Sequence, residues 1–146
     1  MKRLLTPVCI ALAATTAVAH QGVKNPDVMA RMNSMTSAKD AFREVLLMAS
    51  EKAPFDAVKA AAARDILIRS GQDTPSLFAN GATDPKSEAL PVIWTQFDDF
   101  TAKAQSFTAA AIALDPTSLA GLKAGMPAVG EGCRACHFTY RKEEDG

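Results

Sequence analysis

The chain carries no excess of charge of either sign, because sixteen basic residues balance sixteen acidic ones among 146. Without a basic surface, nothing in the composition indicates binding to nucleic acid. No segment alternates apolar and polar residues as a half-buried strand does, and no stretch repeats another. The charges are mixed and apolar residues occur throughout, which excludes a disordered chain. One compact domain remains as the expectation.

Long hydrophobic runs are also scarce, and the one that stands out lies at the N-terminus. Two basic residues precede about fifteen mostly apolar ones, and a small-x-small cleavage pattern ends at Ala19. A run this short, interrupted by Pro7, is poorly suited to crossing a membrane. We therefore expect a secretory signal peptide over residues 1–19 and a mature domain over residues 20–146, with no membrane insertion after the leader is removed.

Four segments have the residue spacing of amphipathic helices. Asn25 is a suitable N-cap for the first, and Pro26 suits its first turn. Gly71 is expected to end the second and to begin a long loop, and Pro127 is expected to kink the last. The sequence therefore predicts an all-α fold, an antiparallel four-helix bundle. The expected helices cover residues 26–50, 55–70, 87–113 and 118–142, and the expected loop covers residues 71–86.

A five-residue motif near the C-terminus carries the chemistry: Cys133-Arg134-Ala135-Cys136-His137. This is the pattern by which c-type haem is attached. Residues three and four apart share one face of a helix, so both thiols and the imidazole can address one flat ring. The thiols would bond to the haem vinyl groups and His137 would ligate the iron. We expect one covalent haem c per chain, held in the last helix.

Three other readings of the two cysteines are weaker. A dithiol redox site usually opens a helix in a fold that contains strands. A disulfide between Cys133 and Cys136 would close a loop too tight to stabilise the chain much. A zinc site needs a fourth ligand, and the only other histidine is His20 at the mature N-terminus.

Methionine is the soft side chain available as a second axial ligand, since no other internal histidine exists. Five methionines follow the leader: Met29, Met32, Met35, Met48 and Met126. Periodicity favours Met35, which lies seven residues after Val28 and seven before Phe42 on the apolar stripe of the first helix. From the pattern alone, Met35 could equally be a core filler, as most helical methionines are.

A haem motif in the last helix of a secreted four-helix bundle resembles cytochrome c′ and its low-spin relatives, the class II c-type cytochromes. The resemblance rests on Arg31 followed by Met35, on the segment from Pro91 to Phe100, and on the motif with the residues after it. It implies that Met35 stands over the distal face of the iron and ligates it, as in the low-spin His/Met subgroup. It also implies that Arg31 contacts a haem propionate and that Arg141 lies beside the haem.

The chain departs from many members of that family at the residue after the proximal histidine, which is Phe138 here. We expect this side chain to bury the proximal face of the imidazole further and so to tune the iron. Trp94 and Tyr140 are expected to pack in the core or against the haem edge.

The leading functional hypothesis is electron transfer in the periplasm through six-coordinate, low-spin iron held by His137 and Met35. The alternative is five-coordinate iron of the cytochrome c′ type that binds or sequesters nitric oxide or carbon monoxide. An enzyme such as a peroxidase is disfavoured, because no distal acid or base is identifiable. The expected partners are redox proteins that the sequence does not identify. The family resemblance also implies a homodimer formed through the first two helices.

Overall fold

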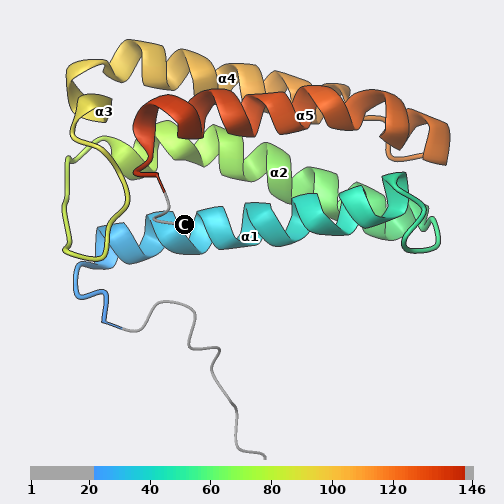
Figure 1. Cartoon of the computed structure of the whole chain (residues 1–146), viewed down its shortest axis with the longest axis horizontal. Helices are drawn as coiled ribbons and strands as arrows, with labels where there is room; N and C mark the ends of the chain where they lie inside the picture. The colour runs from blue at the N-terminus through green and yellow to red at the C-terminus, as the bar shows by residue number, and fades with distance from the viewer. Residues whose placement is uncertain (1–21, 144–146) are drawn as a thin grey trace, which may run out of the picture.

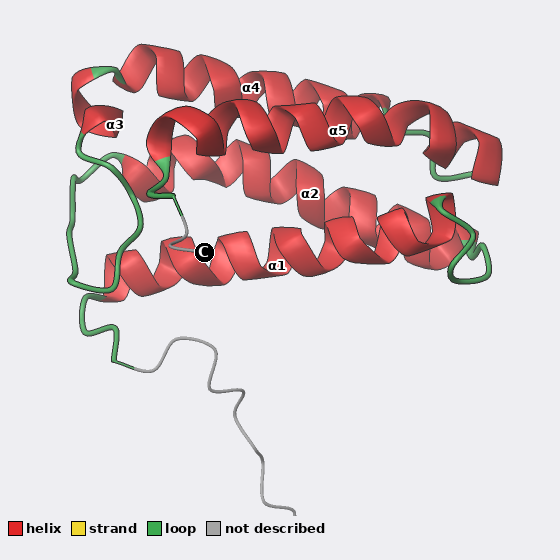
Figure 2. Ribbon diagram, in the orientation of Figure 1, coloured by secondary structure: helices red, strands yellow, loops and turns green. Residues whose placement is uncertain are grey.

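The computed structural model describes residues 22–143, so the predicted leader lies outside the described part of the chain. Helices joined by loops make up this part, and no strand occurs in it (Figure 2). None of the described helices is long and apolar enough to span a membrane. The helices are α1 (Pro26–Ala49), α2 (Ala57–Phe78), α3 (Val92–Thr95), α4 (Phe97–Ala113) and α5 (Leu119–Tyr140).

The four long helices form an antiparallel bundle in which the chain runs up and down in turn (Figure 1). Helix α1 packs on α2, α2 on α4, α4 on α5 and α5 on α1, while α3 is a single turn beside the start of α4. Two apolar clusters fill the bundle. The larger lies among α1, α2, α4 and α5, and the smaller, aromatic cluster lies where α2, α3, α4 and the end of α5 meet. The predicted all-α four-helix bundle is confirmed.

The first helix begins where its capping residue predicts. The Asn25 Oδ1 atom accepts hydrogen bonds from the backbone amides of Asp27 and Val28, and Pro26 occupies the first turn. This cap satisfies amides that have no partner within the helix. Helix α1 ends at Ala49, one residue before the predicted end.

The second helix is longer than the sequence predicts, because Gly71 does not end it. Helix α2 continues through Gly71 and Pro75 to Phe78, so the first half of the expected loop is helical. A Cβ atom on Gly71 would lie 2.3 Å from Thr108 Oγ1 and 2.9 Å from Phe107 Cδ1 on α4. The glycine therefore serves close packing of α2 on α4 and not chain reversal. Pro75 lacks the amide that would bond the Gly71 carbonyl, a loss that the packing tolerates.

Gly71→Ala is expected to destabilise the fold, because the added methyl group clashes with Thr108 and Phe107 on α4. Overpacking of this kind costs about 1–3 kcal/mol. That cost outweighs the roughly 0.5–1 kcal/mol that alanine gains over glycine within a helix. Gly130→Ala is the matched control, because its Cβ would meet only Phe42 at an ordinary 3.6 Å. Chemical denaturation should show a lower unfolding free energy for the first variant and no loss for the second.

The predicted third helix is interrupted. Helix α3 stops at Thr95, Gln96 has φ −127° and ψ 40°, and α4 begins at Phe97. Residues 87–90 are not helical, although the sequence pattern placed them in this helix. They lie instead beside the end of α5, where an isolated antiparallel bridge joins Ala89 to Arg141. A backbone partner 52 residues away therefore overrides the local helical preference of this segment.

The last helix runs without interruption from Leu119 to Tyr140, Pro127 included. Its glycines permit close approach to α4: a Cβ on Gly132 would lie 3.1 Å from the Phe107 Cα atom. These glycines therefore set how tightly α5 packs on α4. Gly132 directly precedes Cys133, so this tight contact fixes the position of the motif.

Candidate haem site

The cysteine motif occupies the last two turns of α5. Cys133 and Cys136 are half-buried free thiols, and His137 is exposed. Burial raises the pKa of both thiols, that of Cys136 to about 11. Thiols of raised pKa are protonated at neutral pH and react slowly with oxidants. Although the His137 side chain reaches solvent, partial desolvation by its neighbours, together with the charge of Arg141, lowers its pKa and favours the neutral imidazole that binds metals.

An aromatic cluster supports the motif from behind. Cys136 packs against a group that includes Phe78, Ile93 and Phe100. Tyr140 is 3% exposed and makes an edge-on ring contact with Phe100 at 5.3 Å, so its predicted packing role is confirmed.

A polar network ties the same turn of α5 to α4. The Tyr140 hydroxyl donates a 2.5 Å hydrogen bond to Asp99 Oδ2, which also accepts from Lys103 at 2.6 Å. Burial and the Asp99 carboxylate raise the pKa of Tyr140 to about 12, so its hydroxyl stays protonated. The backbone that carries Cys136 and His137 is therefore anchored on one side before any ring binds.

The register of α1 against α5 places Met35 at the level of His137. The reference point is Gly130 on α5, whose Cβ would lie 3.6 Å from the Phe42 ring on α1. The two helices are antiparallel (Figure 1). Moving seven residues forward on α5 and seven back on α1 therefore leads from this contact to His137 and Met35. Seven residues make nearly two full helical turns, so the side-chain direction rotates by only about 20° over this distance. His137 therefore points in nearly the same direction as Gly130, and Met35 in nearly the same direction as Phe42.

The seam between α1 and α5 is also the loosest of the four in the bundle. The other neighbouring helices pack together more extensively, and in Figure 1 the α1 and α5 ribbons diverge toward the end that carries the motif. Two thiols on one face of α5 and a neutral imidazole one residue later are the donor set of covalent haem, and the neighbouring α1–α5 seam is loose. The residues present therefore fit the group that the motif predicts.

The structure reduces the set of candidate methionine ligands. Met48 and Met126 are 2% and 5% exposed and belong to the larger apolar cluster, away from Cys136. Both are core fillers. Met29, Met32 and Met35 are half-buried on α1. Met35 is the one that the α1–α5 register sets opposite His137, and its role as a ligand stays a prediction.

Arg31 is buried, at 3% exposed, and its guanidinium is held by the chain itself. Nε donates to the Leu77 carbonyl, Nη1 to the Ala82 carbonyl and Nη2 to Asn80 Oδ1, each at 2.7 Å. The guanidinium carbon also lies 4.6 Å from the centre of the Phe78 ring, a cation–π contact. Arg31 therefore fastens the loop after α2 to α1. The predicted contact with a haem propionate stays a prediction, in which the side chain would use its remaining N–H groups.

Arg31→Ala is expected to detach residues 79–84 from α1. It should lower the free energy of unfolding by about 1–3 kcal/mol, the cost of leaving buried polar groups without partners. Hydrogen exchange of the amides in that loop should become faster. Arg43→Ala is the matched control on the same helix, because Arg43 is exposed. Exposed substitutions usually change stability by less than about 0.5 kcal/mol. Equal effects of the two substitutions would contradict the fastening role.

Arg141 lies one turn beyond His137, as predicted, and its Nε donates to Glu88 Oε2 at 2.7 Å. Its predicted contact with the haem stays a prediction. Phe138 is 82% exposed, so its side chain points to solvent. The expectation that Phe138 covers the imidazole is therefore wrong. Consecutive helical residues point about 100° apart, which directs residue 138 away from the face that His137 uses.

Sequence reasoning missed Glu88, Asn80 and Asp99. The i,i+4 spacing of Asp99 and Lys103 is a local signal that could have indicated their ion pair. Glu88 and Asn80 meet Arg141 and Arg31 across 53 and 49 residues, and no local pattern encodes such contacts.

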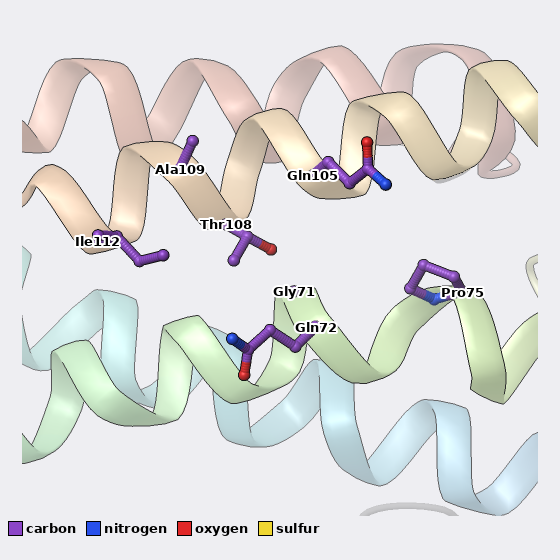
Figure 3. Close-up of a pocket in the computed structure, with 7 residues that line it drawn as sticks. All are labelled: Gly71, Gln72, Pro75, Gln105, Thr108, Ala109 and Ile112. Carbon is purple, nitrogen blue, oxygen red and sulfur yellow. The ribbon is translucent and has the colours of Figure 1, made fainter.

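An open groove of about 370 Å³ lies elsewhere, on the seam between α2 and α4 (Figure 3). It contains none of the predicted site residues and no charged side chain. Its floor is the close approach at Gly71, so it is a by-product of tight helix packing. The residues that line it are Gly71, Gln72, Pro75, Gln105, Thr108, Ala109 and Ile112.

Comparisons with known proteins agree with this geometry. The family model for cytochrome c′ matches residues 27–141. Cytochrome c-554 of Cereibacter sphaeroides is 38% identical over 104 residues, which is 66% of this chain and 78% of that protein. Cytochrome c′ of Rubrivivax gelatinosus is 32% identical over 119 residues, 77% of this chain and 92% of that one.

A solved structure is similar in both fold and sequence. The nitric oxide complex of a cytochrome c′ mutant from Alcaligenes xylosoxidans has a TM-score of 0.71 and 28% identity, covering 80% of this chain and 94% of that one. The family match spans the bundle from the start of α1 to the residue after α5, the motif included. The chain belongs to the cytochrome c′ family and carries covalent haem c.

Proposed function

We propose that this chain is a haem c protein that binds a diatomic gas, nitric oxide or carbon monoxide, on the iron face turned toward α1. The observation that carries the proposal is the similarity, over 80% of the chain, to a cytochrome c′ solved as its nitric oxide complex. Bound haem supplies an iron with one axial position beyond that of the proximal ligand. In this proposal no residue of the chain acts as a catalyst.

Four residues have distinct roles at this site. Cys133 and Cys136 hold the ring through covalent bonds, and the neutral imidazole of His137 is the proximal ligand. In this proposal Met35 would lie on the gas side, and the register of α1 against α5, which brings it level with His137, supports this role. A gas molecule must move the Met35 side chain aside, so this residue controls access.

Electron transfer with His137 and Met35 as the two axial ligands is the second candidate function. The observation that favours it is Met35 itself, because a thioether is a good ligand of haem iron. Membership of the cytochrome c′ family does not single out a His/Met-ligated subgroup, and the comparisons favour gas binding. The sequence alone led us to rank the two functions in the reverse order.

Optical absorption of the oxidised and reduced protein, before and after addition of carbon monoxide, separates the two functions. Gas binding predicts that the reduced spectrum changes on addition and saturates with one equivalent per chain. A ferric Met–iron charge-transfer band together with no response to carbon monoxide would establish the electron carrier and reject gas binding. Absence of any haem spectrum would reject both.

The same proposal places the protein in the periplasm, after removal of a leader at residues 1–19. Leu46 on α1 and Val58 on α2 are 44% and 80% exposed, which supports a homodimer formed through these two helices. Redox partner proteins would dock at the haem edge. Sedimentation of the mature chain tests the dimer.

A further inference from the structure

A short strap of chain covers the C-terminal end of α5. Residues 87–90, in the loop before α3, run antiparallel to residues 140–142. The Leu90 amide donates to the Tyr140 carbonyl at 2.9 Å, and the Lys142 amide donates to the Glu88 carbonyl at 2.8 Å. The strap therefore has a fixed register on the turn that follows His137.

Side chains of the strap and of α5 form an ion pair at this place. Arg141 Nε donates to Glu88 Oε2 at 2.7 Å, and the two side chains are 35% and 52% exposed. The Arg141 amide donates to the His137 carbonyl at 3.1 Å, which places Arg141 one helical turn after His137.

We propose that Glu88 is a positioning residue for the proximal side of the haem, which holds Arg141 in a neutral ion pair beside His137 and thereby sets the reduction potential. The inference rests on the proposed role of His137 as proximal ligand. Ferric iron carries one more positive charge than ferrous iron, so a net positive charge nearby disfavours the ferric state. Within the pair, the carboxylate of Glu88 offsets the positive charge of Arg141.

The sign of each effect follows from Coulomb attraction and repulsion. Glu88→Gln keeps the side-chain length and removes one negative charge, so the potential rises. Arg141→Gln removes one positive charge, so the potential falls. The double variant removes one charge of each sign and returns the potential toward that of the unmodified protein. At a fixed ambient potential, each single change should shift the ratio of reduced to oxidised protein by roughly 1.5- to 5-fold, the range measured for exposed ion pairs.

An equilibrium redox titration of the haem-loaded protein, followed by optical absorption, tests the proposal. Glu51→Gln is the matched control, because it removes the same charge from the Glu51–Lys123 ion pair at the opposite end of the bundle. It should not move the potential. The opposite shifts of the two single variants should shrink as ionic strength rises from about 0.01 M to 1 M, since the screening length falls from about 30 Å to 3 Å.

Shifts of the same sign in both single variants, or no shift in either, would overturn the proposal and leave Glu88 a purely structural tie. Arg141→Gln tests the sign independently, so the experiment stays decisive even where Glu88→Gln perturbs the strap. Failure of the proposed function looks different: a His137→Ala protein that keeps an unchanged haem spectrum would reject the proximal ligand itself.

Discussion

Replacing Cys133 and Cys136 together with alanine is expected to abolish covalent retention of haem. The two thiols are half-buried on one face of α5, and the chain has only one other cysteine, Cys9, within the predicted leader. After extraction with acidified organic solvent, the intact mass of the double variant should equal that of the polypeptide alone. The unmodified protein should retain the mass of one haem.

Single variants serve as controls for this experiment. Cys133→Ala or Cys136→Ala leaves one thiol, and one bond is enough to retain the ring through extraction. The double variant also keeps His137, so any haem that remains with it before extraction is held by coordination alone. A haem mass that persists after extraction of the double variant would contradict attachment at this motif.

Met35→Ala is expected to accelerate binding of carbon monoxide to the reduced protein by on the order of tenfold or more. Inserting extra atoms into a packed site forces side chains out of their preferred conformations at a cost of roughly 1–3 kcal/mol, and about 1.4 kcal/mol corresponds to a factor of ten. Alanine has no thioether to move aside, so this cost disappears. Rapid mixing of the reduced protein with carbon monoxide measures the rate directly.

Met32→Ala and Met29→Ala are the matched controls, since both residues are half-buried methionines on the same helix. Neither lies opposite His137 in the α1–α5 register, so their rates should stay within a few-fold of the original. A faster rate in one of these variants and not in Met35→Ala would show that the residue over the distal face is a different methionine of α1. Equal rates in all three would reject control of access by α1 methionines.

The parts of the structure that could be predicted from sequence depend on local chemistry. Asn25 and Pro26 start α1 because capping and ring geometry act within one turn. The spacing of Cys133, Cys136 and His137 predicts that the three side chains share one face of a helix, because residues three and four apart lie on the same face. The amphipathic spacing of the third segment also predicts which side chains enter the core, since Ile93 and Phe100 are 1% and 3% exposed.

The errors arise where a distant partner decides the local structure. Gly71 carries the local signal of a helix end, yet Phe107 and Thr108 on another helix require a residue without a Cβ atom at this place. The sequence pattern around Arg31 is that of a surface or ligand-binding residue. In the structure its side chain is buried and donates hydrogen bonds to three acceptors near the end of α2. Glu88 finds its partner across 53 residues. Such contacts are fixed by helix packing, which a single sequence read in local windows does not encode.

Proton NMR of the reduced protein under carbon monoxide tests the central claim most directly, because it locates the side chain over the distal face of the ring. The account predicts that the Met35 methyl resonance is shifted far upfield by the haem ring current and shows nuclear Overhauser contacts to haem meso protons. Assignment is made by its loss in Met35→Leu. An upfield methyl resonance that instead belongs to Met29 or Met32, with Met35 at an ordinary shift, would contradict the α1–α5 register and the site built on it.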